Sequence, residues 1–140
     1  MQIVDVNVLI YAVNSAARHH DAASQWLTAA LRGEDTVAFA WPALLEFLRI
    51  STNRSVFERP LSVDQAFELI KTWTSGPKAV IIDPTSRHLT IMQELIDRVG
   101  TVDNLTTDAH LAALAVEYGA RIVSFDRDVE RFGVGVVVPG

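Results

Sequence analysis

The chain has 140 residues, of which 49% are hydrophobic and 21% are charged, and its formal net charge is −5 at pH 7. This length and composition predict a single folded domain over residues 1–140 and exclude a disordered protein. The sequence contains no Cys, which excludes disulfide bonds and thiolate metal sites. An acidic chain repels nucleic acid at long range, so tight electrostatic binding of a polyanion is not expected unless bound cations offset the charge.

The N-terminal residues Met1–Asp5 carry no basic segment, and no apolar stretch approaches the ~20 residues that a membrane span requires. We therefore expect a soluble, cytoplasmic protein with no membrane contact. Arginine outnumbers lysine ten to two, and the forked guanidinium group suits the recognition of phosphate. The candidates for phosphate contacts are Arg18, Arg49, Arg54, Arg59, Arg127 and Arg131.

Short apolar runs alternate with longer amphipathic segments along the first half of the chain. The pattern predicts a strand over 2–6, a helix that Asn7 caps, a helix from about 18 to 31, and a strand over 36–40. Pro42 suits the first turn of a helix that continues to about residue 50.

The second half continues the same alternation. Ser62 is the predicted N-cap of a helix that ends near residue 74, with Gln65 as its capping-box partner. A buried strand over 79–82, helices over 86–99 and 106–118, a strand over 121–125 and an edge strand over 134–138 follow. Such alternation favours right-handed crossovers, and therefore a three-layer α/β/α domain with a central, mainly parallel sheet of four to five strands.

Four acidic residues stand where apolar runs of the chain end: Asp5, Glu46, Asp108 and Asp126. The carboxyl ends of parallel strands share one edge of a sheet, and open α/β folds place their sites at that edge. We therefore expect the four side chains to meet there. Carboxylate oxygens are preferred ligands of Mg²⁺ and Mn²⁺, so the pattern predicts a divalent-metal site.

Each of these acids also has a simpler interpretation. An acid at a strand end is more often a helix cap than a ligand, and Asp108 in a first helical turn interacts favourably with the helix dipole without any metal. Glu46 differs, because apolar residues flank it and an unpaired, ionised carboxylate is costly to desolvate, so it needs a cation or a donor. Asn7 and Ser124 are candidate donors that orient the carboxylates, and each is equally well explained as a cap or turn residue.

Several carboxylates packed together raise the pKa of at least one of them, and a bound divalent ion relieves that repulsion. Such an ion orients a water molecule, lowers its pKa, and stabilises charge on a phosphodiester during in-line displacement. The predicted chemistry is metal-assisted phosphodiester hydrolysis that leaves a 5′-phosphate.

Other groups of residues carry weaker signals. His19, His20 and His110 lack the spacing of a zinc site and are expected to be surface or helix residues. The three Trp residues are suited to stacking on bases, but aromatic residues on apolar faces are usually part of the core. Residues 44–48 and the helix from Ser62 form a candidate self-complementary dimer face.

Four segments in this order resemble the PIN-domain ribonucleases, and most closely the VapC toxins of type II toxin–antitoxin pairs: residues 4–10, 42–49, 107–115 and 123–128. The resemblance runs nearly end to end. It implies a PIN-like domain that acts as a Mg²⁺- or Mn²⁺-dependent endoribonuclease, with Asp5, Glu46, Asp108 and Asp126 as the acidic metal site and Asn7 and Ser124 in support. Relatives often have threonine in place of Ser124. Asp128 competes with Asp126 as the fourth acid, and Asp126 is favoured because it is nearer the strand end.

The resemblance also implies partners. A cognate VapB-like antitoxin is expected to cover the site with its tail, the toxin is expected to form a homodimer, and the assembly is expected to contact operator DNA only through the antitoxin. Two alternatives remain open: a non-catalytic PIN-like binding module whose acids act as caps or accept an arginine from a partner, and a metal-dependent nuclease that acts on DNA. The sequence does not specify the RNA, the cleavage sequence or the number of ions.

Overall fold

A parallel β-sheet forms the centre of the molecule. The computed structural model describes residues 1–101 and 103–140. Five strands lie in the order β3-β2-β1-β4-β5, and every neighbouring pair is parallel. The strands are β1 (Gln2–Val4), β2 (Val37–Ala40), β3 (Ala79–Ile82), β4 (Arg121–Val123) and β5 (Val136–Val137).

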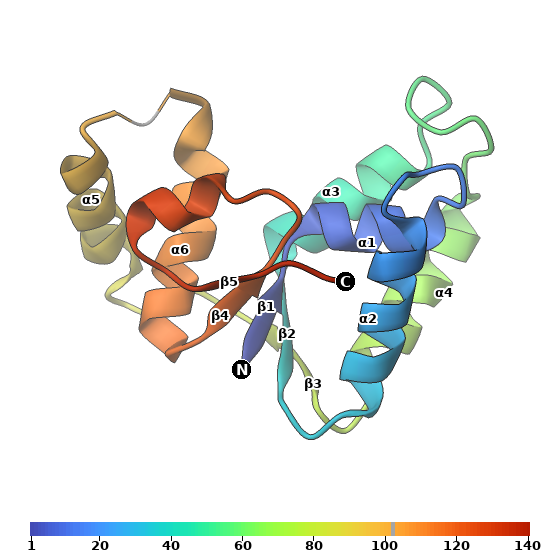
Figure 1. Cartoon of the computed structure of the whole chain (residues 1–140), viewed down its shortest axis with the longest axis horizontal. Helices are drawn as coiled ribbons and strands as arrows, with labels where there is room; N and C mark the ends of the chain where they lie inside the picture. The colour runs from blue at the N-terminus through green and yellow to red at the C-terminus, as the bar shows by residue number, and fades with distance from the viewer. Residues whose placement is uncertain (102) are drawn as a thin grey trace.

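Helices cover both faces of this sheet, which confirms the predicted three-layer fold. In Figure 1, α5 and α6 lie on one side of the strands and the first four helices lie on the other. The helices are α1 (Val6–Val13), α2 (His20–Arg32), α3 (Trp41–Ser51), α4 (Val63–Thr74), α5 (His88–Val99) and α6 (Thr106–Tyr118), and two 3₁₀ turns, η1 (Asp103–Leu105) and η2 (Asp128–Phe132), precede α6 and β5.

The two faces of the sheet bury two separate apolar cores, because successive side chains of a strand point to opposite faces. Ile3 and Ile122 belong to the core shared with α5 and α6. Val4 and Val123, their neighbours in sequence, belong to the core shared with α1 to α4. Because β1 and β4 pair in parallel, with Val4 opposite Val123, their carboxyl ends lie at the same edge of the sheet.

Three sequence predictions about element ends are wrong. Helix α1 is capped by Asp5 and not by Asn7, because the Asp5 side chain accepts a hydrogen bond from the Val6 N–H at 2.7 Å. The first strand therefore ends at Val4. Strand β4 ends at Val123, two residues earlier than predicted, and the chain then turns across the end of the sheet.

The strand over 79–82 was predicted to be buried, and this is also wrong. β3 is an edge strand, and Val80 and Ile81 are 37% and 40% exposed. The predicted capping box of α4 is confirmed, since the Ser62 side chain accepts from Gln65 N–H and the Gln65 side chain accepts from Ser62 N–H. Within the described residues, no helix combines the length and the apolar character needed to cross a lipid bilayer.

Candidate active site

Asp5 lies at the carboxyl end of the central strand β1. Its backbone N–H donates to the Val123 carbonyl at 2.9 Å, which ties it to the neighbouring strand β4. One carboxylate oxygen accepts from Val6 N–H, and the other accepts from the Ser124 hydroxyl at 2.7 Å and from the Asn7 amide at 3.3 Å. Burial raises the pKa of Asp5 above 3.8, and the charge of Asp126 adds to this against the opposing hydrogen bonds from Ser124 and Val6.

Ser124 and Asn7, the two predicted donors, both contact Asp5. Ser124 is fully buried, and its hydroxyl also accepts from the Asn7 amide at 2.9 Å and from Asp126 N–H at 3.0 Å. The Asn7 side-chain carbonyl accepts from Phe125 N–H at 3.1 Å. This network fixes the segment after β4 against the start of α1, and so it positions Asp126 relative to Asp5.

Three further carboxylates gather at the same edge of the sheet. Asp108, Asp126 and Asp128 each offer an oxygen, and these oxygens lie within 4.8 Å of one another. Asp108 comes from the first turn of α6 and is half-buried, whereas Asp126 and Asp128 are exposed, Asp126 in the segment after β4 and Asp128 as the first residue of η2. The backbone N–H of Asp128 donates to Asp126 Oδ1 at 2.9 Å, which holds these two acids side by side.

The electrostatics connect this cluster to Asp5. The pKa of Asp108 is raised from 3.8 to about 6, first by burial and then by the negative charges of Asp5, Asp126 and Asp128. The positive charge of Arg131 opposes this increase, and Arg131 also pairs with Asp128 at 3.5 Å. The four aspartates therefore repel one another, as expected of a site that accepts a cation.

Glu46 has a different environment. Its side chain is 44% exposed on α3 and pairs with the Arg49 guanidinium at 2.7 Å. The hydrogen bond from Arg49 lowers the pKa of Glu46 below 4.5. The expectation of a desolvated Glu46 is wrong, because Leu44 and Phe47 face the core and leave position 46 on the outer side of the helix. Arg49 is the donor that this carboxylate needs, and Glu46 does not belong to the group of acids at shared ligand distance among the described residues.

The aspartate cluster suits a hard divalent cation. All of its ligand atoms are carboxylate oxygens, which Mg²⁺ and Mn²⁺ prefer, and no Cys in the sequence offers a softer ligand. Burial is the main cause of the raised pKa of Asp5 and Asp108, and neighbouring negative charges raise both further. A divalent ion held by Asp108, Asp126 and Asp128 would offset those charges, whereas Asp5 does not belong to this group at shared ligand distance among the described residues.

Comparison with known proteins places the chain in a family. The PIN domain family model matches residues 3–135. Over 132 residues the chain is 49% identical to Ribonuclease VapC37 of Mycobacterium tuberculosis, covering 94% of this chain and 92% of that protein. The chain belongs to the VapC ribonucleases of the PIN domain family. Ribonuclease VapC33 of the same species is 39% identical over the same shares of the two chains.

Solved structures of more distant proteins share the fold. The crystal structure of VapBC2 from Rickettsia felis bound to a DNA fragment from its promoter matches with a TM-score of 0.69 and 17% identity, over 99% of this chain and 98% of that one. Mycobacterium tuberculosis VapC20, described as a sarcin-ricin loop cleaving toxin, matches with a TM-score of 0.69 and 15% identity, over 99% and 100% of the two chains. At these identities the likeness concerns the fold.

Some neighbours of the site were not identified from the sequence. The rings of Tyr11 and His19 pack against Phe125, which directly precedes Asp126. No local pattern indicates this contact, because Phe125 is distant in sequence from both Tyr11 and His19. His110, expected to be a surface or helix residue, lies on α6, where its Nδ1 contacts His88 Nε2 at 2.8 Å. That pair joins α5 to α6 and has no contact with the aspartates among the described hydrogen bonds.

Proposed function

We propose that this chain is the toxin of a type II toxin–antitoxin pair, an endoribonuclease that hydrolyses RNA phosphodiester bonds with Mg²⁺ or Mn²⁺. The observation that carries the proposal is a cluster of mutually repelling aspartates at the carboxyl edge of the sheet, in a chain that is 49% identical to a VapC ribonuclease. The active unit is a single PIN domain over residues 1–140.

Asp5, Asp108 and Asp126 are proposed to hold the ion, with Asp128 as a neighbouring acid. When bound, the divalent ion supplies a Lewis acid for the phosphodiester and lowers the pKa of the attacking water. Asp5 is oriented for this task by Ser124 and Asn7, since both of its oxygens already accept hydrogen bonds. Asp108, whose pKa is about 6, holds a proton below that pH and loses it near neutrality, where it becomes available as a ligand.

We include Glu46 in the site on the ground of the family resemblance. It is exposed and its one ionic partner among the described residues is Arg49, an exposed side chain three positions further along α3. An exposed ion pair of this kind contributes little to stability. The carboxylate can therefore leave Arg49 and turn towards the ion without a large loss of folding free energy.

The proposed partners are RNA, a VapB-like antitoxin and a second copy of the toxin. Solved toxin–antitoxin complexes share this fold, among them VapBC2 bound to promoter DNA and a complex from Klebsiella pneumoniae. Operator DNA is expected to be contacted through the antitoxin, because this chain is acidic. A homodimer face on α3 and α4 is supported by large exposed apolar side chains there: Trp41, Leu45, Val63 and Phe67. The proposed setting is the cytoplasm.

The test uses purified protein freed of any antitoxin, with RNA and single- and double-stranded DNA as substrates, in Mg²⁺, Mn²⁺ or EDTA. We expect RNA cleavage that requires a divalent ion and that Asp5→Asn and Asp108→Asn abolish. Glu94→Gln is the matched control, since it removes an exposed carboxylate of α5 that belongs to no acidic cluster among the described residues.

The results also separate the two alternatives. Cleavage of DNA in place of RNA would indicate the DNA nuclease. Folded protein that cuts neither polymer, and whose unfolding temperature does not rise with Mn²⁺, would indicate the binding module.

A further inference from the structure

Three aromatic rings pack together beside the aspartates, and we call them the aromatic group: Tyr11 of α1, His19 immediately before α2, and Phe125 after β4. The rings of His19 and Phe125 are stacked, with centroids 4.6 Å apart and planes inclined by 15°. Tyr11 meets Phe125 edge-on at 5.3 Å and lies 5.8 Å from His19. All three side chains are half-buried, so the group remains accessible at the surface.

Hydrogen bonds join the aromatic group to the acidic site. Phe125 lies between Ser124, which donates to Asp5, and Asp126 of the aspartate cluster. Its backbone N–H donates to the same Asn7 side chain whose amide contacts Asp5. Asn7 therefore links the Phe125 backbone to the Asp5 carboxylate, and the fold holds Phe125 close to the acidic site.

The His19 ring is half-buried, and Phe125 is its stacked partner. Tyr11 does not lie on the face of His19 opposite Phe125, because its centroid is closer to Phe125 than to His19, and this places it alongside the stacked pair. His19 occupies the N-cap position of α2 but makes no side-chain capping bond. Its imidazole therefore contributes to the stack and not to the helix end.

We propose that the face of His19 opposite Phe125 is accessible and stacks on an unpaired base of single-stranded RNA next to the cleaved bond. The inference rests on the proposed ribonuclease function and adds the form of RNA that the site takes. Every base has a π face, and proteins that bind single-stranded RNA stack bases on aromatic rings in this way. Bases inside a duplex are already stacked and paired, so they cannot reach the ring.

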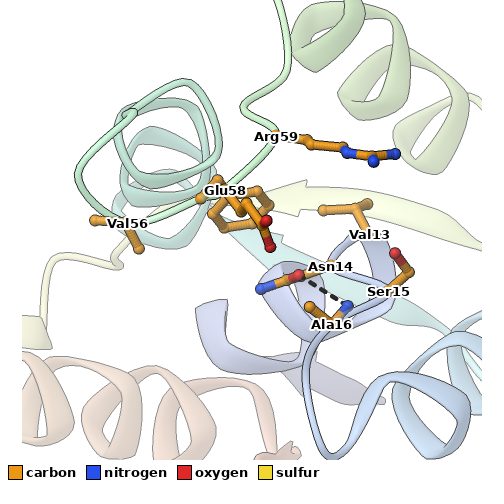
Figure 2. A pocket seen from close by; sticks show the side chains of 8 residues that line it. Val13, Asn14, Ser15, Ala16, Val56, Glu58 and Arg59 are labelled. Carbon is orange, nitrogen blue, oxygen red and sulfur yellow. Dashed lines mark hydrogen bonds between the residues drawn. The ribbon is translucent and has the colours of Figure 1, made fainter.

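The loop between α1 and α2 that carries His19 also has positive charge for the RNA backbone. Arg18 is exposed directly before His19. The same loop faces residues 56–59 across a pocket of about 320 Å³, over which Figure 2 shows Arg59 extending. Neither arginine has an ion pair among the described residues. Glu58 also lines this pocket and repels an anion there. We therefore expect the two arginines to contribute only weak attraction for the RNA backbone, and the His19 ring to make the main contact with the RNA.

Steady-state cleavage of a single-stranded RNA oligonucleotide with Mn²⁺ tests the proposal. We expect His19→Ala to raise KM by about 5- to 100-fold, the range for losing one base stack, and to change kcat by less than about threefold. His19→Trp keeps a stacking face and is expected to retain a KM close to that of wild type. Leu89→Ala, which removes an exposed apolar side chain from α5, is the control and is expected to change neither constant.

A binding experiment tests the same contact without cleavage. The oligonucleotide carries 2-aminopurine at successive positions, and the buffer contains EDTA. Wild-type protein and His19→Trp are expected to quench the fluorescence at one position, and His19→Ala is expected not to. An unchanged KM and unchanged quenching in folded His19→Ala would overturn the proposal, as would His19→Trp behaving like His19→Ala. If wild-type protein cuts no RNA, the proposed function fails, and the fluorescence result decides the stacking contact separately.

Discussion

Asp108→Asn is expected to stabilise the protein without metal and to remove the stabilisation that metal provides. The pKa of Asp108 is raised from 3.8 to about 6, so the folded protein holds this proton more tightly than the unfolded chain does. Ionising Asp108 therefore destabilises the fold. This penalty is absent below pH 3.8, grows as the pH rises, and is complete above about pH 6.

The size of the effect follows from the same values. The difference between 3.8 and about 6 corresponds to a ceiling of about 3 kcal/mol. Because the carboxylate is partly exposed, solvent reduces both the cost of burying its charge and the repulsion from its neighbours, and a penalty of about 1.5 kcal/mol is more realistic. The variant also loses a favourable interaction with the N-terminus of α6, about 0.5 kcal/mol. The net gain of about 1 kcal/mol raises the unfolding temperature by about 3 °C.

Thermal unfolding by calorimetry measures this directly. In EDTA at about pH 8, Asp108→Asn should unfold at a higher temperature than wild type, and the advantage should fall to about half near pH 5. Adding Mn²⁺ should then raise the unfolding temperature of wild type more than that of the variant. Glu94→Gln controls for the loss of a surface charge. A variant that is less stable than wild type in EDTA at both pH values would refute the conclusion that ionised Asp108 destabilises the fold.

Three further predictions concern other parts of the molecule. Ser124→Ala removes a buried hydroxyl that contacts Asp5, Asn7 and Asp126. It should lower the free energy of unfolding by about 1–3 kcal/mol and weaken Mn²⁺ binding by about 10- to 100-fold in a calorimetric titration. Ser124→Thr keeps the hydroxyl and should retain the affinity. Glu46→Gln should reduce RNA cleavage while leaving the unfolding temperature nearly unchanged, because its pair with Arg49 is exposed; full activity would remove Glu46 from the site. Glu117→Gln should destabilise the protein by about 2 kcal/mol above pH 4.5. Burial raises the pKa of Glu117, but hydrogen bonds from His88 and Thr85 lower it below 4.5 on balance, so the loss of stability should fade as the pH falls through that lowered pKa. A pH-independent difference in unfolding temperature would contradict this account.

The sequence by itself determined the architecture of this protein. Apolar runs of strand length alternate with longer amphipathic segments, and this pattern depends only on local periodicity. Local signals also fixed the capping box of Ser62 and Gln65, because its two hydrogen bonds join residues three positions apart. The placement of Asp5 and Asp126 at the carboxyl edge of the sheet was likewise visible, since a parallel sheet brings its carboxyl ends to one edge.

The tertiary structure decided which side chains meet at that edge. Ser124 and Asp5 are 119 positions apart, and no local pattern indicates their contact. Asp126 and Asp128 both join Asp108, although the sequence favoured the first of them alone, because the chain leaves β4 two residues early and turns both acids to the same side. The exposure of Glu46 depends on the rotation of α3 against the sheet, and the edge position of β3 depends on strand order. Local periodicity contains neither of these, because both are set by packing between distant segments.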